Sequence, residues 1–357
     1  MTASKKIRQL LGFFLKFALA GGIIAYMVRD PSGIVEGFRA FDLRWLIPAM
    51  AAYGSHMVVC AWRWRRLAML LGVKLGAAEA LSLTMQGYFF SLVIPGGAIG
   101  GDVVKMGVVS KRAPAGGKME GAFTVLMDRI VGMIALFALE LAILLPALPI
   151  LMNVTVPDLP LDAGAKRLGV LLLALLGLAG IGASCVIFFH RVLERIPGVG
   201  ALMRWGDRIT RGMVSRLTAA TDVYLRNWRE LLGLIAASIP LVHLMTVVPL
   251  GFLLAGLGIP FRCFDIAVAV TIGNIIGLLP IFPAGVGGRD VAIITLLVAS
   301  GIPAADAKTA QLLYTAILLF FNLTGGIFFV FDRGGSRPAL AAALAEAETS
   351  VEKEERR

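Results

Sequence analysis

Two short stretches of the sequence decide the fold: residues 94–104 read IPGGAIGGDVV, and residues 282–292 read FPAGVGGRDVA. Aligned without a gap, they share five of eleven residues at an offset of 188, the difference between positions 283 and 95. The identical pairs are Pro95 with Pro283, Gly97 with Gly285, Gly100 with Gly288, Asp102 with Asp290, and Val103 with Val291. Proline and paired glycines interrupt an α-helix. Each stretch therefore predicts a broken helix, and the shared pattern predicts an internal repeat.

The chain around these stretches is apolar enough to have the bilayer as its solvent. Hydrophobic residues make up 58% of the 357 positions and charged residues only 16%, and the mean hydropathy is +0.84. The three cysteines, Cys60, Cys185 and Cys263, lack metal-ligand spacing and are interpreted as packing residues. The formal charge of +11 comes from lysines and arginines that flank apolar stretches, which predicts contact with lipid head groups and not with nucleic acid.

The lengths of the apolar stretches predict an all-α polytopic membrane protein, because a full crossing needs about 20 residues. Residues 81–109 and 264–300 are each too long for one span and too short for two, and each has a broken centre, which predicts two re-entrant hairpins. The six full spans are expected at about residues 7–28, 43–60, 119–148, 168–189, 231–257 and 310–331. Lys16 interrupts the first of these, which favours an uncleaved span over a signal peptide.

The positive charges predict how the chain is oriented. Lysine and arginine gather at the amino terminus, around the first hairpin and in residues 190–230, so we expect these on the cytoplasmic side of a bacterial inner membrane. Counting the crossings places the carboxyl terminus on the same side. Three full crossings separate the hairpins, which predicts an inverted repeat with units of about 43–148 and 231–331. Residues 1–335 are expected to form a single transmembrane domain, followed by a cytoplasmic tail at 336–357. Residues 190–230, rich in arginine, are expected to form an amphipathic helix on the anionic leaflet.

The hairpins offer two roles for their aspartates. Asp102 and Asp290 follow the glycines where a helix N-cap belongs, so capping is one interpretation. The other is a lipid site, because a helix that begins inside the bilayer turns its N–H groups toward an anion and glycine allows close approach. The residues predicted to bind substrate are Pro95, Gly97, Gly100, Gly101, Asp102, Lys105, Asp128, Arg129, Pro283, Gly285, Gly287, Gly288, Arg289 and Asp290.

Charged and polar residues inside the expected spans are a further signal of function. Asp128 and Arg129 lie about 14 Å into their span, where an ionisable residue indicates a functional site. Arg129 is expected to reach a phosphate or a hairpin aspartate. Interhelical hydrogen bonds are the favoured interpretation for six other residues, Glu140, His56, His243, Gln86, Asn274 and Asn322.

Three segments resemble a known family: residues 88–102 (YFFSLVIPGGAIGGD), 126–132 (LMDRIVG) and 279–287 (LPIFPAGVG). They are similar to the lysylphosphatidylglycerol synthase transmembrane region family, also called flippase-like integral membrane proteins, and the resemblance covers about residues 7–331. In the bacterial multiple peptide resistance factor, a domain of this family translocates aminoacylated phosphatidylglycerol. No part of this chain corresponds to the synthase domain of that protein, so the resemblance implies transport without synthesis. Asp290 departs from the family pattern, in which glutamate is expected.

We therefore expect a lipid translocase for a phospholipid, glycolipid, or polyprenyl- or hopanoid-type lipid with an anionic or phosphate-bearing head group. No GxxxxGK[ST] motif is present, and no cofactor, metal site or catalytic residue is expected. Two alternatives remain open at this stage: an intramembrane lipid-modifying enzyme that uses an aspartate as base, and a non-transporting envelope assembly factor. Association between copies of the chain also remains open.

Overall fold

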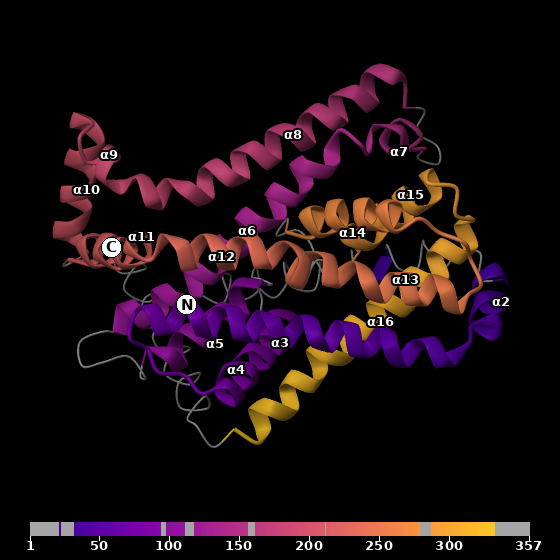
Figure 1. Cartoon of the computed structure of the whole chain (residues 1–357), viewed down its shortest axis with the longest axis horizontal. Helices are drawn as coiled ribbons and strands as arrows, with labels where there is room; N and C mark the ends of the chain where they lie inside the picture. Colours follow the sequence, from indigo (N-terminus) through magenta and orange to yellow (C-terminus); the bar gives the residue numbers. More distant parts are fainter. Residues whose placement is uncertain are drawn as a thin grey trace, which may run out of the picture.

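The computed structural model describes residues 21–22, 32–93, 98–110, 118–155, 161–210, 212–278 and 287–332. Within these ranges the protein is all-helical (Figure 1). The helices are α2 (Ser32–Ala40), α3 (Leu46–Leu70), α4 (Ala77–Val93), α5 (Ala98–Val109), α6 (Lys118–Leu144), α7 (Leu148–Met152), α8 (Ala163–Cys185), α9 (His190–Leu193), α10 (Pro197–Ile209), α11 (Met213–Arg226), α12 (Trp228–Ser238), α13 (Val247–Gly256), α14 (Cys263–Gly277), α15 (Gly288–Ala299) and α16 (Ala304–Val330).

Four helical segments of the described chain are long and apolar enough to cross a bilayer: Met119–Leu144, Ala163–Leu193, Trp228–Gly256 and Ala304–Val330. They coincide with four of the six expected spans. The span expected at residues 7–28 lies outside the described residues except for Gly21 and Gly22, which are helical. The remaining expected span lies in α3, which has 25 residues but contains Arg63, Arg65 and Arg66.

The aromatic and basic run of residues 62–66 does not end a span, as its composition suggested. Instead, α3 continues through the run to Leu70. Arg63 is 6% exposed and Trp64 is 0% exposed, so both side chains lie against other helices of the protein. Only Trp62 in this run keeps a largely exposed ring. A sequence window cannot distinguish these faces, because every third or fourth residue of a helix points the same way.

The internal repeat is visible in the order and spacing of the helices. The helices α4, α5 and α6 begin at residues 77, 98 and 118, and α14, α15 and α16 begin at 263, 288 and 304, so their offsets are 186, 190 and 186 residues. The helix α3 corresponds to the continuous segment from α12 to α13. Near Pro240, the segment Ile239–His243 forms one π-helical turn, an irregularity that proline produces in a helix.

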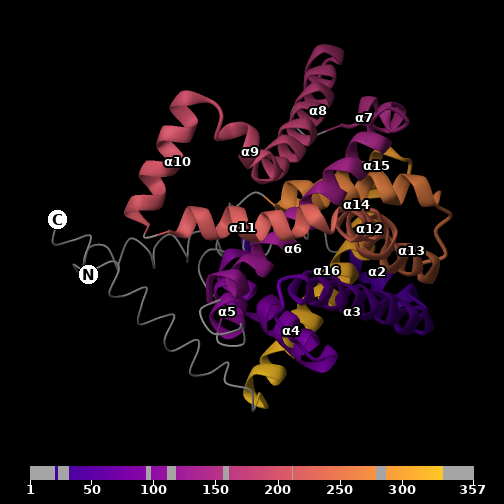
Figure 2. The same ribbon diagram turned by 60° about the vertical axis from the view of Figure 1, so that its left-hand side comes forward.

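The first helices of the two units run in opposite directions. The backbone N–H of Asp42, just before α3, donates to the carbonyl of Gly256 at the end of α13, at 2.9 Å. At the other end of α3, Arg66 pairs with Glu230 at the start of α12, at 2.7 Å. Each hairpin also packs against the last helix of the other unit, α4 on α16 and α14 on α6. Figure 2 shows α9 and α10 projecting from the helix bundle, while α11 returns toward it.

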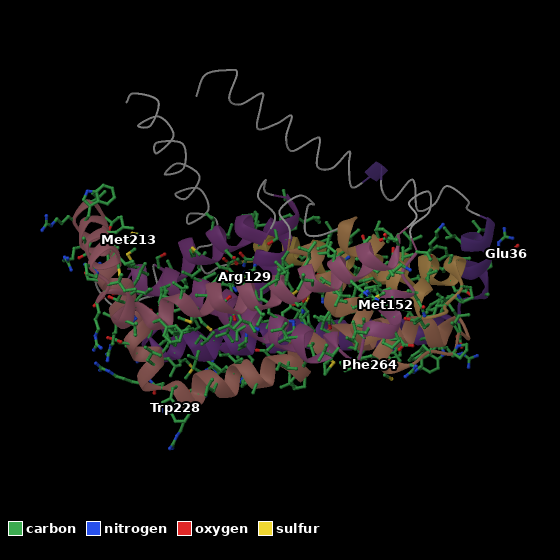
Figure 3. The ribbon with its side chains drawn as sticks, turned by 90° about the horizontal axis from the view of Figure 1, so that it is seen from above. Glu36, Arg129, Met152, Met213, Trp228 and Phe264 are labelled. Atoms are coloured by element: carbon green, nitrogen blue, oxygen red, sulfur yellow. The ribbon has the colours of Figure 1, made fainter. Side chains whose placement is uncertain are left out.

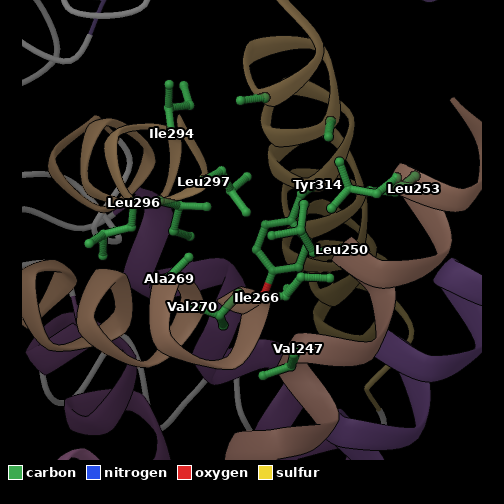
Figure 4. Close-up of a cluster of buried hydrophobic side chains, with 14 of the residues drawn as sticks. Val247, Leu250, Leu253, Ile266, Ala269, Val270, Ile294, Leu296, Leu297 and Tyr314 are labelled. Atoms are coloured by element: carbon green, nitrogen blue, oxygen red, sulfur yellow. The ribbon is translucent and has the colours of Figure 1, made fainter. Parts of the chain in front are cut away.

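The largest hydrophobic cluster joins the second unit to α3. Figure 4 shows its centre, where Leu250 and Leu253 of α13 and Ile266 of α14 surround Tyr314 of α16. All four side chains are at most 1% exposed. The Tyr314 hydroxyl donates to the carbonyl of Thr246 at 3.1 Å, within the irregular stretch before α13. This bond satisfies a polar group inside an otherwise apolar cluster.

In the first hairpin, α4 and α5 touch backbone to backbone. A methyl group added at Gly101 would collide with the carbonyl oxygen of Gly87 and with the hydroxyl of Ser91. In the second hairpin, a methyl group at Gly273 of α14 would lie 2.5 Å from Ile293 and 3.3 Å from the carbonyl of Arg289. Neither α5 nor α15, with 12 residues each, has the length of a full span. Close packing of this kind is typical of helix pairs in membranes, where small residues let backbones approach.

We predict that Gly101→Ala destabilises the protein by about 1–3 kcal/mol, because the added carbon overpacks the contact between α4 and α5. The thermal unfolding midpoint in detergent measures the effect. Gly182→Ala in α8 is the matched control, because a methyl group there meets nothing within 4 Å. Equal midpoints for the two variants would contradict the prediction.

Candidate functional site

Asp102 of α5 and Arg129 of α6 form a bidentate ion pair. Arg129 Nε donates to Asp102 Oδ2 at 2.8 Å, and Nη2 donates to Oδ1 at 3.0 Å. The Asp102 side chain is 13% exposed, whereas that of Arg129 is 44% exposed and lies between the two ends of the molecule (Figure 3). The capping interpretation of Asp102 is wrong, because α5 begins at Ala98 and Asp102 is its fifth residue.

Lys105 lies one turn beyond Asp102 and is 7% exposed. Its ammonium group lies 4.0 Å from the ring centre of Trp64, a cation–π contact. The Trp64 indole is itself fixed, since Nε1 donates to Thr124 Oγ1 at 3.2 Å. Lys105 interacts electrostatically with Asp102 and Asp128, but no described carboxylate lies within 4.0 Å of its ammonium group.

Arg63 of α3 and Asp128 of α6 form a second, more buried ion pair. Arg63 Nε donates to Asp128 Oδ1 at 2.8 Å, and a second guanidinium nitrogen donates to Ser238 of α12 at 3.2 Å. The side chains of Arg63 and Asp128 are 7% and 12% exposed. The sequence had indicated a role for Asp128 but placed Arg63 at an interface. No sequence signal placed Arg63 inside the protein, because the end of α3, seven residues beyond Arg63, is known only from the structure.

These residues form one group, which we call the charge cluster: Arg63, Asp102, Lys105, Asp128 and Arg129. Three cations face two carboxylates, so the cluster has a formal surplus of one positive charge. Both carboxylates are paired with arginine, and the surplus is carried mainly by Lys105. The chemistry that such a group supports is the binding of an anion, because arginine presents a planar pair of donors that matches a phosphate or carboxylate.

Asp290 occupies the corresponding position in the second unit but has different surroundings. It is the third residue of α15, and its Oδ2 accepts from the backbone N–H of Gly287 at 2.9 Å. Its Oδ1 accepts from Arg289 Nη2 at 2.8 Å, from Gln311 at 2.8 Å and from Thr315 at 3.0 Å. The side chains of Arg289 and Asp290 are only 5% and 2% exposed. Asp290 therefore does cap its helix, from the third position instead of the N-cap.

The glycines of the two hairpins also have different local conformations and contacts. Gly287 has a φ of 100°, a conformation that favours glycine over any residue with a side chain, and Gly288 begins α15. Gly100 lies within the first turn of α5, beside the tightly packed Gly101. Four residues predicted to bind substrate, Pro95, Gly97, Pro283 and Gly285, lie outside the described residues.

Three of the polar residues expected to bond between helices do so. His56 Nδ1 lies 3.1 Å from the carbonyl of Val242, His243 Nε2 lies 3.0 Å from the carbonyl of Gly132, and Asn274 donates to Thr246 at 3.3 Å. The expectation was wrong for the others. Gln86 donates to Ser82 of its own helix. The side-chain oxygens of Glu140 and Asn322 have no hydrogen-bond partner within the described part of the chain.

The segment expected as one amphipathic helix at 190–230 consists of α9, α10, α11 and the start of α12. Its outer helix, α10, exposes Trp205 and Ile209, each at 61%, beside Arg204 and Arg208. Arg191 donates to Asp222 of α11 at 3.0 Å. This hydrogen bond from a guanidinium lowers the pKa of the Asp222 carboxyl below its ordinary value. At this end of the molecule, α10 therefore projects with a surface that is both apolar and basic.

The sequence profile of one family, the lysylphosphatidylglycerol synthase TM region, matches residues 13–326. The chain belongs to this family. It is also similar to a protein of Pyrococcus horikoshii described as a UPF0104 membrane protein, with 21% identity over 298 residues, which cover 82% of this chain and 88% of that protein. With several helices apolar enough to cross a bilayer, this member of the family is an integral membrane protein.

We predict that Asp290→Asn destabilises the protein by about 3–5 kcal/mol, because it leaves the buried Arg289 guanidinium without a counter-charge. Glu230→Gln is the comparison, since the Arg66–Glu230 pair is 43% and 30% exposed and such a pair contributes about 0–1 kcal/mol. Thermal unfolding in detergent measures both. If the two variants lose stability equally, the buried pair does not have the structural role assigned to it.

Proposed function

We propose that the protein is a lipid translocase of the bacterial inner membrane, which moves a phospholipid, glycolipid, or polyprenyl- or hopanoid-type lipid with an anionic or phosphate-bearing head group. The observation that carries the proposal is the charge cluster, which holds a surplus cation among helices of an apolar bundle. A charge within the bilayer is costly, so its retention indicates a function that requires it. Membership of a family named for a lipid synthase supports a lipid as the substrate.

The head group would bind by exchanging partners with Asp102. In the structure, Asp102 accepts from Nε and Nη2 of Arg129, which keeps the guanidinium neutralised. A phosphate presents the same bidentate acceptor geometry and adds contact with the surplus charge of Lys105. Arg129, with its side chain 44% exposed, is the member of the cluster that an incoming head group reaches first.

An apolar groove next to the cluster would hold the lipid chain. It has a volume of about 580 Å³ and lies between α3, α4 and α16. Its lining is mostly apolar and includes Met57, Val59, Met85 and Phe328. Along α3, Val59 lies four residues before Arg63, which is about 6 Å of helix. A head group at the cluster and a hydrocarbon chain in the groove would therefore be bound by adjacent turns of the same helix.

Two features support movement of the lipid across the membrane and not only its binding. The helices of the second unit follow those of the first in the same order, and α3 runs antiparallel to α12 and α13. Transporters built from inverted repeats bind substrate between their units and rock one unit against the other. The basic and apolar surface of α10 fits the anionic cytoplasmic leaflet and would place that end of the molecule on the cytoplasmic side, the side that we propose for both termini.

The experiment uses vesicles that contain the protein and a fluorescent lipid, with leaflet exchange followed by quenching from outside. We predict that Arg129→Ala slows exchange by about tenfold or more, since a hydrogen-bonded charge contributes about 1.5–3 kcal/mol. Arg129→Lys should recover only part of the rate, because an ammonium lacks the bidentate geometry. Arg262→Ala, at a side chain 81% exposed and outside the charge cluster, is the control.

Exchange no faster than in protein-free vesicles, tested with anionic, glycosylated and isoprenoid lipids, would reject the translocase and favour an assembly factor. Covalently altered lipid recovered from the same vesicles would favour a lipid-modifying enzyme. In the structure Asp102 and Asp128 are each paired with arginine, an arrangement that suits an anion-binding site better than a general base.

A further inference from the structure

Glu140 is a buried carboxyl group that the charge cluster does not use. It lies in α6 and is 0% exposed. Neither of its side-chain oxygens has a hydrogen-bond partner among the residues that the structure describes. Every other carboxylate discussed above is paired with arginine or bonded to several donors. Glu140 therefore differs in kind from Asp102, Asp128 and Asp290.

One side of Glu140 is covered by α8, at a position where α8 has a glycine. A methyl group added at Gly177 would lie 2.5 Å from Glu140 Oε2 and 3.0 Å from Leu141. The apolar stretch of α8 is otherwise barely enclosed, with 11% of its residues buried, and it forms the outer edge of the bundle (Figure 1). On the α8 side, the carboxyl group is thus separated from the surroundings of the protein by the width of a single helix.

The helices that pack against α6 offer Glu140 no counter-charge. On α8, Arg167 is ten residues from Gly177, which is about 15 Å of helix, and Cys185 is eight residues away on the other side. On α6 itself, the carbonyl of Gly132 receives His243, about 12 Å along the helix from Glu140.

Several charged groups on neighbouring helices are engaged elsewhere. Asp265 at the start of α14 lies 4.0 Å from Arg262, while Arg63 of α3 and Asp102 of α5 belong to the charge cluster. Arg66 and Glu230, on α3 and α12, pair with each other. Asp222 of α11 pairs with Arg191. Within the described chain, no charged side chain interacts with Glu140.

An ionised carboxylate in such a place is far less favourable than the neutral acid, because the neutral acid loses much less solvation free energy when it is buried. We propose that Glu140 is a proton-binding site, protonated while α8 covers it and deprotonated when α8 moves away from α6. One proton is taken from water by the carboxylate and returned to water, and no other group changes. Glu140 lies four residues before the end of α6, which is about 6 Å along the helix.

The position of Glu140 also connects the proton site to the charge cluster. Glu140 and Arg129 are eleven residues apart on one helix, which is about 16 Å along the axis and, at about 100° per residue, nearly the same face. A movement of α6 that accompanies the opening of α8 would therefore act directly on Arg129. The proton site itself goes beyond the proposed function, because it exists whether or not the protein moves a lipid.

Carbodiimide labelling of the full chain in vesicles tests the proposal. A carbodiimide reacts with a protonated carboxyl: the proton passes to a reagent nitrogen, the carboxyl oxygen bonds to the central carbon, and an acyl shift gives a stable N-acylurea without a leaving group. We expect dicyclohexylcarbodiimide, which enters bilayers, to label Glu140, with the adduct found by peptide mass spectrometry. Labelling should fall as pH rises, and a water-soluble carbodiimide should label Glu140 little.

The absence of a Glu140 adduct at every pH tested would overturn the proposal, as would equal labelling by the membrane-permeant and water-soluble reagents. Glu140→Gln is the specificity control: the adduct on that peptide should disappear, and the thermal midpoint should stay within error of the parent because an uncharged group replaces an uncharged group. A large loss of stability in Glu140→Gln would show that the group is ionised in the folded protein. The labelling experiment does not depend on lipid exchange, so failure of this proposal and failure of the translocase proposal are separate results.

Two glycines of α8 provide a matched pair of variants for the role of that helix. We predict that at about pH 4, where even an uncovered glutamate is largely protonated, Gly177→Ala raises labelling of Glu140 by the water-soluble carbodiimide several-fold, because the added methyl group pushes α8 away from Glu140. Gly182→Ala should leave labelling unchanged, since its methyl group meets nothing within 4 Å. Equal labelling in Gly177→Ala and Gly182→Ala would show that α8 does not control access to the carboxyl.

Discussion

An arginine within an apolar helix bundle has to share its charge with a partner from a neighbouring helix, and this requirement organises the first unit of the protein. Arg129 of α6 reaches Asp102 of α5, while the adjacent Asp128 reaches Arg63 of α3. Because adjacent residues of a helix point about 100° apart, one turn of α6 binds two different neighbours. Ser238 extends the same set of contacts to α12 in the second unit.

The second unit has the same order of helices but satisfies its aspartate differently. Asp290 takes its positive partner from the preceding residue, Arg289, and its remaining donors from one face of α16. At the positions equivalent to Lys105 and Arg129, the second unit has Ile293 and Ile317, which are both buried apolar residues. The repeat thus keeps one architecture for two purposes: a surplus of charge in one unit and a closed, neutral pair in the other.

The sequence predicted the all-helical membrane class, the family and the internal repeat, because apolar length and paired glycines are local signals. It also identified Asp128 and Arg129 from their depth in a span. It did not predict that α3 continues past Cys60, since an arginine and a tryptophan at an interface cannot be distinguished by composition from the same residues packed inside. Nor did it single out Gly87 or Gly273, whose importance depends on which helix crosses them. The partners of Arg63 are 65 and 175 residues away, which no pattern of spacing reveals.

The packing of each hairpin on the last helix of the other unit has a consequence for how the protein is made. Gly325 and Gly326 of α16 fit closely against Met85 and Phe89 of α4, yet α16 begins 211 residues after α4 ends, from Val93 to Ala304. At about 5–20 residues per second, the ribosome needs roughly 10–40 s to supply that partner. During this time the first hairpin, with a 12-residue helix that cannot span the bilayer, lacks the surface it will finally occupy. Biosynthesis of this fold therefore leaves its earliest hairpin dependent on lipid or on the insertion machinery until the last helix arrives.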